Sequence, residues 1–328
     1  MQLGDSGRPI GRRFPGDSLV TPVVAPLMAP LASSLVTGLI ALLPRAFVAL
    51  LIALPMALAI SACGGAPESE LTGKPLVLVT VPPQAELVEK IAGDLVEVEV
   101  LVPPDADPHT FEPTIEQMRA VSRASLYFLI GHPALEFEAI WRDRLAREGT
   151  NLRFVNGSEG LSLIPDDPHV WLSPRATRTL ATNLAHALEE LLPEDRESIR
   201  AGLAAFLAEE QALDAEIRST LDQAPLETFL VYHAAWGWFA ADYGLTQIAI
   251  ERGHVHPGPS HIASMLDRAR AEGIRVVFVQ PQVGAQQAES FANEIGGRVV
   301  RVDPLARHWA DNLRAAARAF SDAGTEPK

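Results

Sequence analysis

Cysteine is almost missing from this sequence, because Cys63 is the only one among 328 residues. A lone thiol cannot form an internal disulfide, and it excludes a metal site built on paired cysteines. The sequence also lacks the P-loop of nucleotide-binding proteins, the H-E-x-x-H helix of zinc proteases and the G-x-S-x-G turn of α/β hydrolases. Several of the commonest sequence signals of an enzyme are therefore absent.

Basic residues are too few for a nucleic-acid-binding protein. Lys and Arg number 27 against 41 Asp and Glu, which gives a formal net charge of -14. A protein that binds DNA or RNA neutralises phosphates with a basic surface, so we expect no nucleic acid partner. The length of 328 residues and the hydrophobic content of 48% are enough for two domains, each with a core.

The surroundings of Cys63 give its thiol a role. Arg45 is followed by an uncharged apolar run over residues 46–62, which is the pattern of a secretory signal. The run ends in I-S-A-C, which resembles the lipobox of bacterial lipoproteins, whose cysteine is lipidated. We therefore expect residues 1–63 to be a signal and lipobox region whose signal part is removed, so that Cys63 becomes the mature N-terminus, the lipidation site and the membrane anchor. The alternative is an inert cysteine buried in a transmembrane helix.

The rest of the chain alternates between strand and helix patterns. Residues 64–74 are small, polar and charged, as in a flexible tether. Short β-branched and aromatic runs then predict strands at 75–81, 96–102, 125–131, 152–156, 228–232, 247–251, 275–279 and 298–302. Helical patterns between them include 84–92, 114–123, 234–243, 260–272, 285–295 and 309–321. This alternation predicts βαβ units with parallel sheets.

One long segment, 193–224, has no strand pattern and carries apolar residues at helical spacing. We expect it to be a rigid spine helix. The predicted fold class is therefore α/β, with two lobes that each contain a parallel sheet with flanking helices, joined by the spine helix. The N-terminal lobe would occupy 75–192 and the C-terminal lobe 225–328.

Four side chains that can bind a metal lie where ligands are expected. In open α/β sheets, ligands bind beyond the carboxyl ends of the strands. His109 follows the second predicted strand, and His169 lies in the loop that enters the next helix. His233 and Asp303 directly follow predicted strands of the second lobe. Three imidazoles and a carboxylate can hold Zn²⁺ tetrahedrally, but imidazole also binds other first-row ions, so these residues alone leave the metal open.

Four segments, PPDADPHTFEPT, DPHVWLSP, VYHAAWGWFAADYGL and RVDPL, resemble the four signature regions of the metal-binding proteins of bacterial ABC importers for zinc and manganese. The resemblance covers residues 75–322. It implies a rigid helix between the lobes, and an ion bound between them by His109, His169, His233 and Asp303. Because His is the zinc-type choice at the third position, the resemblance implies Zn²⁺ as the transported ligand, with Mn²⁺ as the alternative ion.

The resemblance also implies a function. We expect a substrate-binding protein that delivers Zn²⁺ to an ABC importer permease, and not an enzyme, because four protein ligands leave no open position for a reacting water. It would be a monomer in the cell envelope, lipid-anchored to a membrane and facing the periplasm or the cell exterior. The alternatives are a Mn²⁺ or Fe²⁺ carrier of the same fold, a secreted metallohydrolase, and a metal-binding adhesin.

Three stretches depart from the family pattern. Only Asp166 and Asp167 precede the second ligand region, where many zinc carriers have a long loop rich in His and acidic residues. Gln280 stands where the family usually has Glu, which predicts an altered contact near the ligands. The third stretch is a histidine-rich loop that holds His254, His256 and His261. We expect these loop histidines to be solvated, with an accessory metal site as the alternative.

Large aromatic residues lie beside the candidate ligands in the sequence. These residues are Trp171, Trp236, Trp238 and Phe239. We expect them to pack around the site and exclude water from it, rather than to bind a cofactor.

Overall fold

The computed structural model describes residues 73–149, 151–224, 226–251, 257–282 and 285–325. The predicted signal and lipobox region with Cys63, most of the predicted tether, and two histidines of the histidine-rich loop, His254 and His256, lie outside the described residues. Within the described part of the chain, no helix combines the length and the apolar character needed to cross a bilayer.

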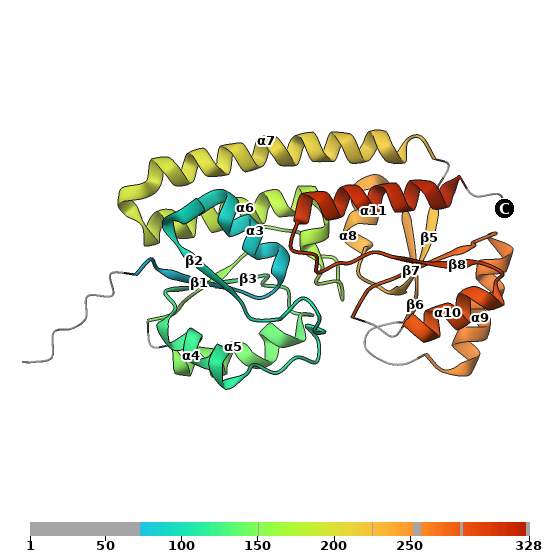
Figure 1. The fold of residues 1–328 in the computed structure, drawn as a ribbon, viewed down its shortest axis with the longest axis horizontal. Coiled ribbons are helices and arrows are strands. Elements are labelled where there is room, and N and C mark those ends of the chain that lie inside the picture. Colours follow the sequence, from blue (N-terminus) through green and yellow to red (C-terminus); the bar gives the residue numbers. More distant parts are fainter. Residues whose placement is uncertain (1–72, 150, 225, 252–256, 283–284, 326–328) are drawn as a thin grey trace, which may run out of the picture. The chain divides into compact units, whose positions relative to one another are not determined.

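The first sheet has four parallel strands in the order β2-β1-β3-β4 (Figure 1). Its strands are β1 (Leu76–Val79), β2 (Glu97–Val100), β3 (Leu126–Leu129) and β4 (Arg153–Asn156). The central strands read LVLV and LYFL and are fully buried, whereas the edge strands read EVEV and RFVN and are partly exposed. This difference follows from the burial of central parallel strands on both faces.

Helices cover both faces of the first sheet. One face packs against α3 (Pro82–Ala92) and α6 (Pro174–Leu191), and α7 (Arg196–Leu221) lies on the outer side of these two helices (Figure 1). The other face packs against α4 (Ile115–Arg123) and α5 (Glu136–Glu148). Short 3₁₀ turns lie at η1 (Gly93–Leu95), η2 (Val170–Leu172) and η3 (Pro193–Asp195). The sheet is therefore the middle layer of three.

The second sheet repeats this plan in the order β6-β5-β7-β8, again with parallel strands. Its strands are β5 (Thr228–His233), β6 (Thr246–Glu251), β7 (Val276–Val279) and β8 (Arg298–Arg301). One face packs against α8 (Gly237–Tyr243) and α11 (Trp309–Gly324), and the other against α9 (Pro259–Ala271) and α10 (Ala285–Glu294) (Figure 1). All eight predicted strands are present within a few residues of their predicted bounds.

The predicted spine is α7, a helix of 26 residues that follows the 3₁₀ turn η3 and ends at Leu221. At 1.5 Å per residue it is roughly 39 Å long. It packs against α3 and α6 of the first sheet and against α11 of the second sheet. Its buried carboxylate, Glu210, is bound by the Arg178 guanidinium of α6, with Nη2 2.7 Å from Oε2. The predicted fold class is thus confirmed.

The two sheets share one hydrophobic core on the side of α7. A single cluster of buried residues continues from Val77 and Val79 of β1, through Phe206 of α7, to Phe229 of β5 and Phe320 of α11. Two smaller clusters lie on the opposite faces, under α4 and α5 in the first lobe and under α9 and α10 in the second. One continuous cluster therefore covers the face of each sheet that points toward α7. For these two faces the expectation that each lobe has a core of its own is wrong.

Candidate metal centre

His109 lies in the loop between β2 and α4. The loop turns back on itself at Asp107, whose Oδ1 accepts a hydrogen bond from the His109 amide at 3.0 Å. Prolines on both sides, Pro108 and Pro113, restrict the backbone of this loop. The His109 side chain is only 6% exposed. The loop backbone belongs to no helix or strand, but it still places the His109 imidazole in the interior of the protein.

His169 immediately precedes the 3₁₀ turn η2 and is 6% exposed. The turn into it is sharp, since Asp166 has a φ of 62°, in the left-handed region that Asp and Asn tolerate best among residues with a side chain. Asp167 Oδ1 then accepts a hydrogen bond from the His169 amide at 3.1 Å. A short acidic turn thus fixes the second imidazole.

His233 is the last residue of β5 and is 8% exposed. The chain leaves the sheet there and forms α8 four residues later. His233 is at the carboxyl end of a central parallel strand, where open α/β sheets bind ligands.

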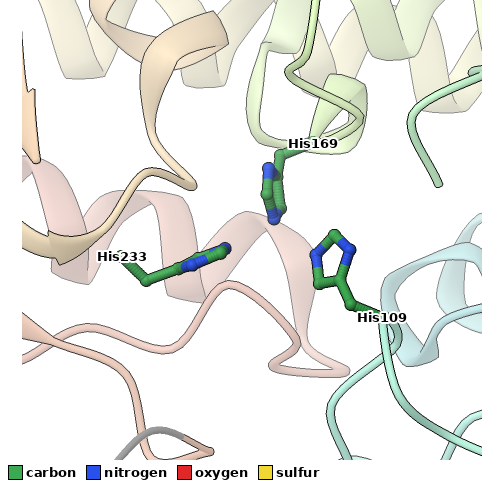
Figure 2. Close-up of side chains that lie close together, drawn as sticks. All are labelled: His109, His169 and His233. Carbon is green, nitrogen blue, oxygen red and sulfur yellow. The ribbon is translucent and has the colours of Figure 1, made fainter. Parts of the chain in front are cut away.

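The three imidazoles converge on one point (Figure 2). Their ring centroids are 6.0 Å apart for His109 and His169, 5.7 Å for His109 and His233, and 5.5 Å for His169 and His233. One ring nitrogen from each lies within 4.8 Å of the other two. Around a tetrahedral zinc with bonds of ~2.0–2.1 Å the donors would be roughly 3.3 Å apart, so the rings need to close by about 1.5 Å at most.

A carboxylate stands at the Nδ1 atom of each histidine. Asp167 Oδ1 lies 2.8 Å from His169 Nδ1, and Glu251 Oε2 lies 3.7 Å from His233 Nδ1. Glu136 Oε2 is hydrogen-bonded to His109 Nδ1. Because Nδ1 of each ring is directed at a carboxylate, Nε2 is the nitrogen that faces the point between the three rings. The ring orientations in Figure 2 agree with this.

Two of the four aromatic residues expected around the site, Trp171 and Trp238, lie beside the His169 turn. Trp171 lies with its ring centroid 5.2 Å from that of His169, and Trp238 Nε1 donates to the Asp167 carbonyl at 2.8 Å. Trp236 and Phe239 are buried too, but they pack against Phe320 of α11. Trp171 Nε1 also donates to the Pro304 carbonyl at 2.7 Å, which ties the His169 turn to the segment that follows β8. These contacts bury the His169 turn against two tryptophan rings and connect it to the second lobe.

Asp303 is not part of the group of converging ligand atoms among the described residues. Its Oδ1 accepts hydrogen bonds from the Leu305 amide at 2.9 Å and from Gln282 Nε2 at 3.0 Å. Gln282 Nε2 also donates to the Pro104 carbonyl, at 2.7 Å, in the loop that carries His109. The Pro104 carbonyl and the Asp303 carboxylate can only accept hydrogen bonds, so the side-chain nitrogen of Gln282, and not its oxygen, must face them. Gln282 thereby connects the two lobes and holds the Asp303 carboxylate.

A buried acid, Glu138, lies on α5 two residues after Glu136, the partner of His109. Glu138 of α5 accepts hydrogen bonds from the Ile130 and Gly131 amides, each at 2.7 Å, and from the Thr80 hydroxyl. Burial raises the pKa of Glu138 from 4.5 to about 7, and the Thr80, Gly131 and Ile130 donors oppose that rise. Glu138 thus fastens the start of α5, which also carries Glu136, to the carboxyl ends of β1 and β3.

Sequence reasoning did not identify Glu136, Glu251 or Gln282. In the turn after β7 the sequence predicts an altered contact near the ligands at Gln280, whereas the residue that contacts Asp303 is Gln282. The sequence does carry one signal for Glu251, which is its position at the end of a predicted strand. If that strand lies beside the His233 strand, an acid at its end is close enough to contact the His233 ring. His261, which the sequence predicts to lie in the histidine-rich loop, is in the first turn of α9, and its Nε2 lies 3.0 Å from the Ile250 carbonyl. That contact differs from the solvated side chain expected there.

Known proteins resemble this chain along most of its length. The family model described as zinc-uptake complex component A, periplasmic, matches residues 77–323. The crystal structure of ZnuA is 38% identical, has a TM-score of 0.74, and is covered completely by 77% of this chain. A ZnuA deletion mutant with zinc bound has a TM-score of 0.73 at the same 38% identity, over 78% of this chain and 100% of its own.

A longer relative is the zinc-binding lipoprotein AdcA of Streptococcus pneumoniae. It is 24% identical over 295 residues, which are 84% of this chain and 58% of that protein. The chain therefore spans little more than half the length of AdcA.

Proposed function

The chain belongs to the family of periplasmic component A proteins of zinc-uptake complexes, and on this premise we propose that it captures Zn²⁺ outside the cytoplasm and delivers it to an ABC-type importer. It acts as a solute-binding protein, with zinc as cargo. The proposed site lies between the two sheets, with His109, His169 and His233 as ligands.

The observation that carries this proposal is the convergence of three buried imidazoles from separate elements. Two of them come from loops of the first lobe and the third from the end of β5 in the second lobe. A cation held by all three would therefore join the lobes. Each ring already directs Nδ1 at a carboxylate, so little rearrangement is needed before Nε2 can bind the ion.

Zinc is the ion that this donor set favours. Imidazole nitrogen suits Zn²⁺, whereas Mn²⁺ prefers carboxylate and other oxygen donors. The zinc-bound ZnuA structure and the name of the AdcA lipoprotein support the same choice. Competition between Zn²⁺ and Mn²⁺ for the purified protein separates the zinc carrier from a manganese carrier of the same fold.

Asp303 is proposed as the fourth ligand. It comes from the second lobe and lies in the segment tied to Trp171 through Pro304. To bind the ion its carboxylate would exchange the hydrogen bond from Gln282 for a bond to zinc. A fourth protein ligand would close a tetrahedral sphere, which suits capture rather than catalysis.

The location and partners follow from the family. The protein works outside the cytoplasm with an importer permease, and we propose that it is a monomer anchored by lipid on Cys63. The lipoprotein name of AdcA supports the anchor. The N-terminal lobe would comprise 75–192, the spine 193–224 and the C-terminal lobe 225–328.

Replacing His169 with Ala tests the proposed function. We expect zinc affinity to fall by more than the ~10–100-fold that losing a hydrogen-bond partner of a ligand costs, because a ligand itself is removed. Zinc affinity is measured by competition with a chromophoric chelator, and circular dichroism checks the fold. His186→Ala on the exposed side of α6 is the matched control. Zinc binding by His169→Ala as tight as in the parent would remove His169 from the site.

A further inference from the structure

We propose that Glu136, Asp167 and Glu251 are positioning residues, one for each histidine, which aim the metal-binding nitrogen of their ring at the cargo ion. The inference rests on the proposed function, because it assumes that the three histidines bind the ion. It adds a second layer of acidic groups that would not touch the metal. Each of the three acts through Nδ1 of its own histidine.

The chemistry depends on which nitrogen carries the proton. An ionised carboxylate only accepts hydrogen bonds, so a ring nitrogen that faces it must carry the hydrogen. A neutral imidazole has one N–H, and placing it on Nδ1 leaves the lone pair on Nε2. Metal-binding histidines in proteins usually have such a partner, and losing the partner typically costs ~10–100-fold in metal affinity.

Asp167 has the best geometry of the three. Its Oδ1 lies 2.8 Å from His169 Nδ1 and also accepts the His169 amide at 3.1 Å, so one oxygen fixes both the backbone and the ring. The side chains of Asp167 and His169 are 11% and 7% exposed, which keeps water from competing for the contact. Asp167 is held in turn, because Trp238 Nε1 donates to its carbonyl at 2.8 Å.

Glu136 makes the equivalent contact in the other ligand loop. It is the first residue of α5, and its Oε2 is hydrogen-bonded to His109 Nδ1. Its side chain is 41% exposed, against 6% for His109. Water can therefore replace part of what this carboxylate contributes, and we expect a smaller effect than for Asp167.

Glu251 serves His233 from the neighbouring strand. The two residues are register partners at the ends of β5 and β6, so the sheet itself places them side by side. Glu251 Oε2 lies 3.7 Å from His233 Nδ1, with both side chains less than 10% exposed. That separation is too long for a hydrogen bond. A hydrogen bond would form if the His233 ring moves as the site closes.

The three carboxylates also help to balance the charge of a bound dication. Three neutral imidazoles bring no charge to balance a dication, and Asp303 alone would bring one. Negative groups behind each ring lower the energy of a cation at the centre, because interactions in a buried site are screened far less than in water. This arrangement can attract Zn²⁺ while keeping the donor set nitrogen-rich, which retains the preference of imidazole for zinc over manganese.

A merely structural role for Asp167 is the rival explanation, since it also fixes the turn. Two variants separate the roles. Asp167→Ala removes the acceptor, whereas Asp167→Asn keeps an amide oxygen that can still accept from the His169 ring. Asp166→Asn is the matched control, because it removes a neighbouring charge at a left-handed position that Asn tolerates.

The test combines zinc affinity with the protonation of the His169 ring. Affinity is measured by chelator competition, and long-range ¹H–¹⁵N correlation of the metal-free protein reports which ring nitrogen carries hydrogen. We expect Asp167→Ala to weaken zinc binding by ~10–100-fold and to shift hydrogen from Nδ1 to Nε2, with Asp167→Asn restoring part of both. Asp166→Asn should match the parent.

Unchanged affinity, or an unchanged ring pattern, in Asp167→Ala would overturn the proposal for Asp167. If Asp167→Ala fails to fold, Glu136→Ala provides the same test in the other ligand loop, with His109 as the reporting ring. The outcome is separate from that of the proposed function. A parent protein that binds no zinc defeats both ideas, whereas zinc binding that depends on His169 but not on the carboxylates defeats this one alone.

Discussion

Replacing Glu138 with Gln is expected to remove a pH dependence from the stability of the protein. Glu138 is 5% exposed, and burial raises its pKa from 4.5 to about 7. Gln has the size of the protonated acid and no charge at any pH. The variant therefore stays uncharged at every pH. Its amide nitrogen must face a backbone N–H from which the parent carboxyl group accepts a hydrogen bond, and this cost to its stability does not depend on pH.

The sign follows from proton binding in the two states. Between pH 4.5 and about 7 the folded protein keeps the Glu138 proton, whereas the unfolded chain has lost it. The folded state binds more protons in this window, so the stability that this group contributes is fully present below pH 4.5 and is lost as pH rises toward about 7. Above that pH it stays constant.

The magnitude follows from the size of the shift. A rise from 4.5 to about 7 corresponds to roughly 3 kcal/mol, because each pKa unit is worth about 1.4 kcal/mol. This is a large part of the ~5–15 kcal/mol by which most folded domains are stable. Urea unfolding followed by circular dichroism can resolve a change of this size.

The measurement is the difference in free energy of unfolding between parent and Glu138→Gln, determined in chelator from about pH 5 to about pH 8. Taking the difference cancels the titration of histidines and other groups common to both proteins. We expect the parent to lose ~2–3 kcal/mol relative to the variant across this range. Glu148→Gln, at the exposed end of the same helix, should show no such trend. A parent-to-variant difference that is constant with pH would refute the reasoning.

Two further predictions concern the anchor and the fourth ligand. Cys63→Ser should move the protein from the detergent phase to the aqueous phase on membrane fractionation, because it removes the proposed lipidation site; retention in the detergent phase would contradict the anchor. Asp303→Asn should weaken zinc binding about tenfold or more, the cost of losing one charged interaction, while Asp311→Asn on the exposed surface of α11 should not. Equal zinc affinity in Asp303→Asn and the parent would exclude Asp303 as a ligand.

The strands and the three histidines could be predicted because their signals are local. A parallel strand buried on both faces appears as a continuous apolar run, as in β1 and β3, and its end is marked by the return of polar residues. His233 is such a residue. The edge strands β2 and β4 carry charged residues, but the sequence still predicts them because turn residues lie at their ends.

The partners of the histidines could not be predicted because they depend on packing between distant segments. Glu136 is 27 residues from His109, and only the docking of α5 against β1 and β3 brings it to the ring. The same limit applies to Gln282, which meets Pro104 across the lobes. The shared core has a related cause, since periodicity shows which face of α11 is apolar but not which element covers that face.

The shared core also limits how the site can open. Trp309 Nε1 at the start of α11 donates to the Trp171 carbonyl at 2.7 Å, and the Trp309 ring lies 5.5 Å from Phe206 of the spine. All three side chains are at most 4% exposed. Exposing half of three such aromatic side chains would cost on the order of 7 kcal/mol. A wide hinge motion is therefore disfavoured, and we expect capture and release to use the loops that carry His109 and His169, which belong to no helix or strand.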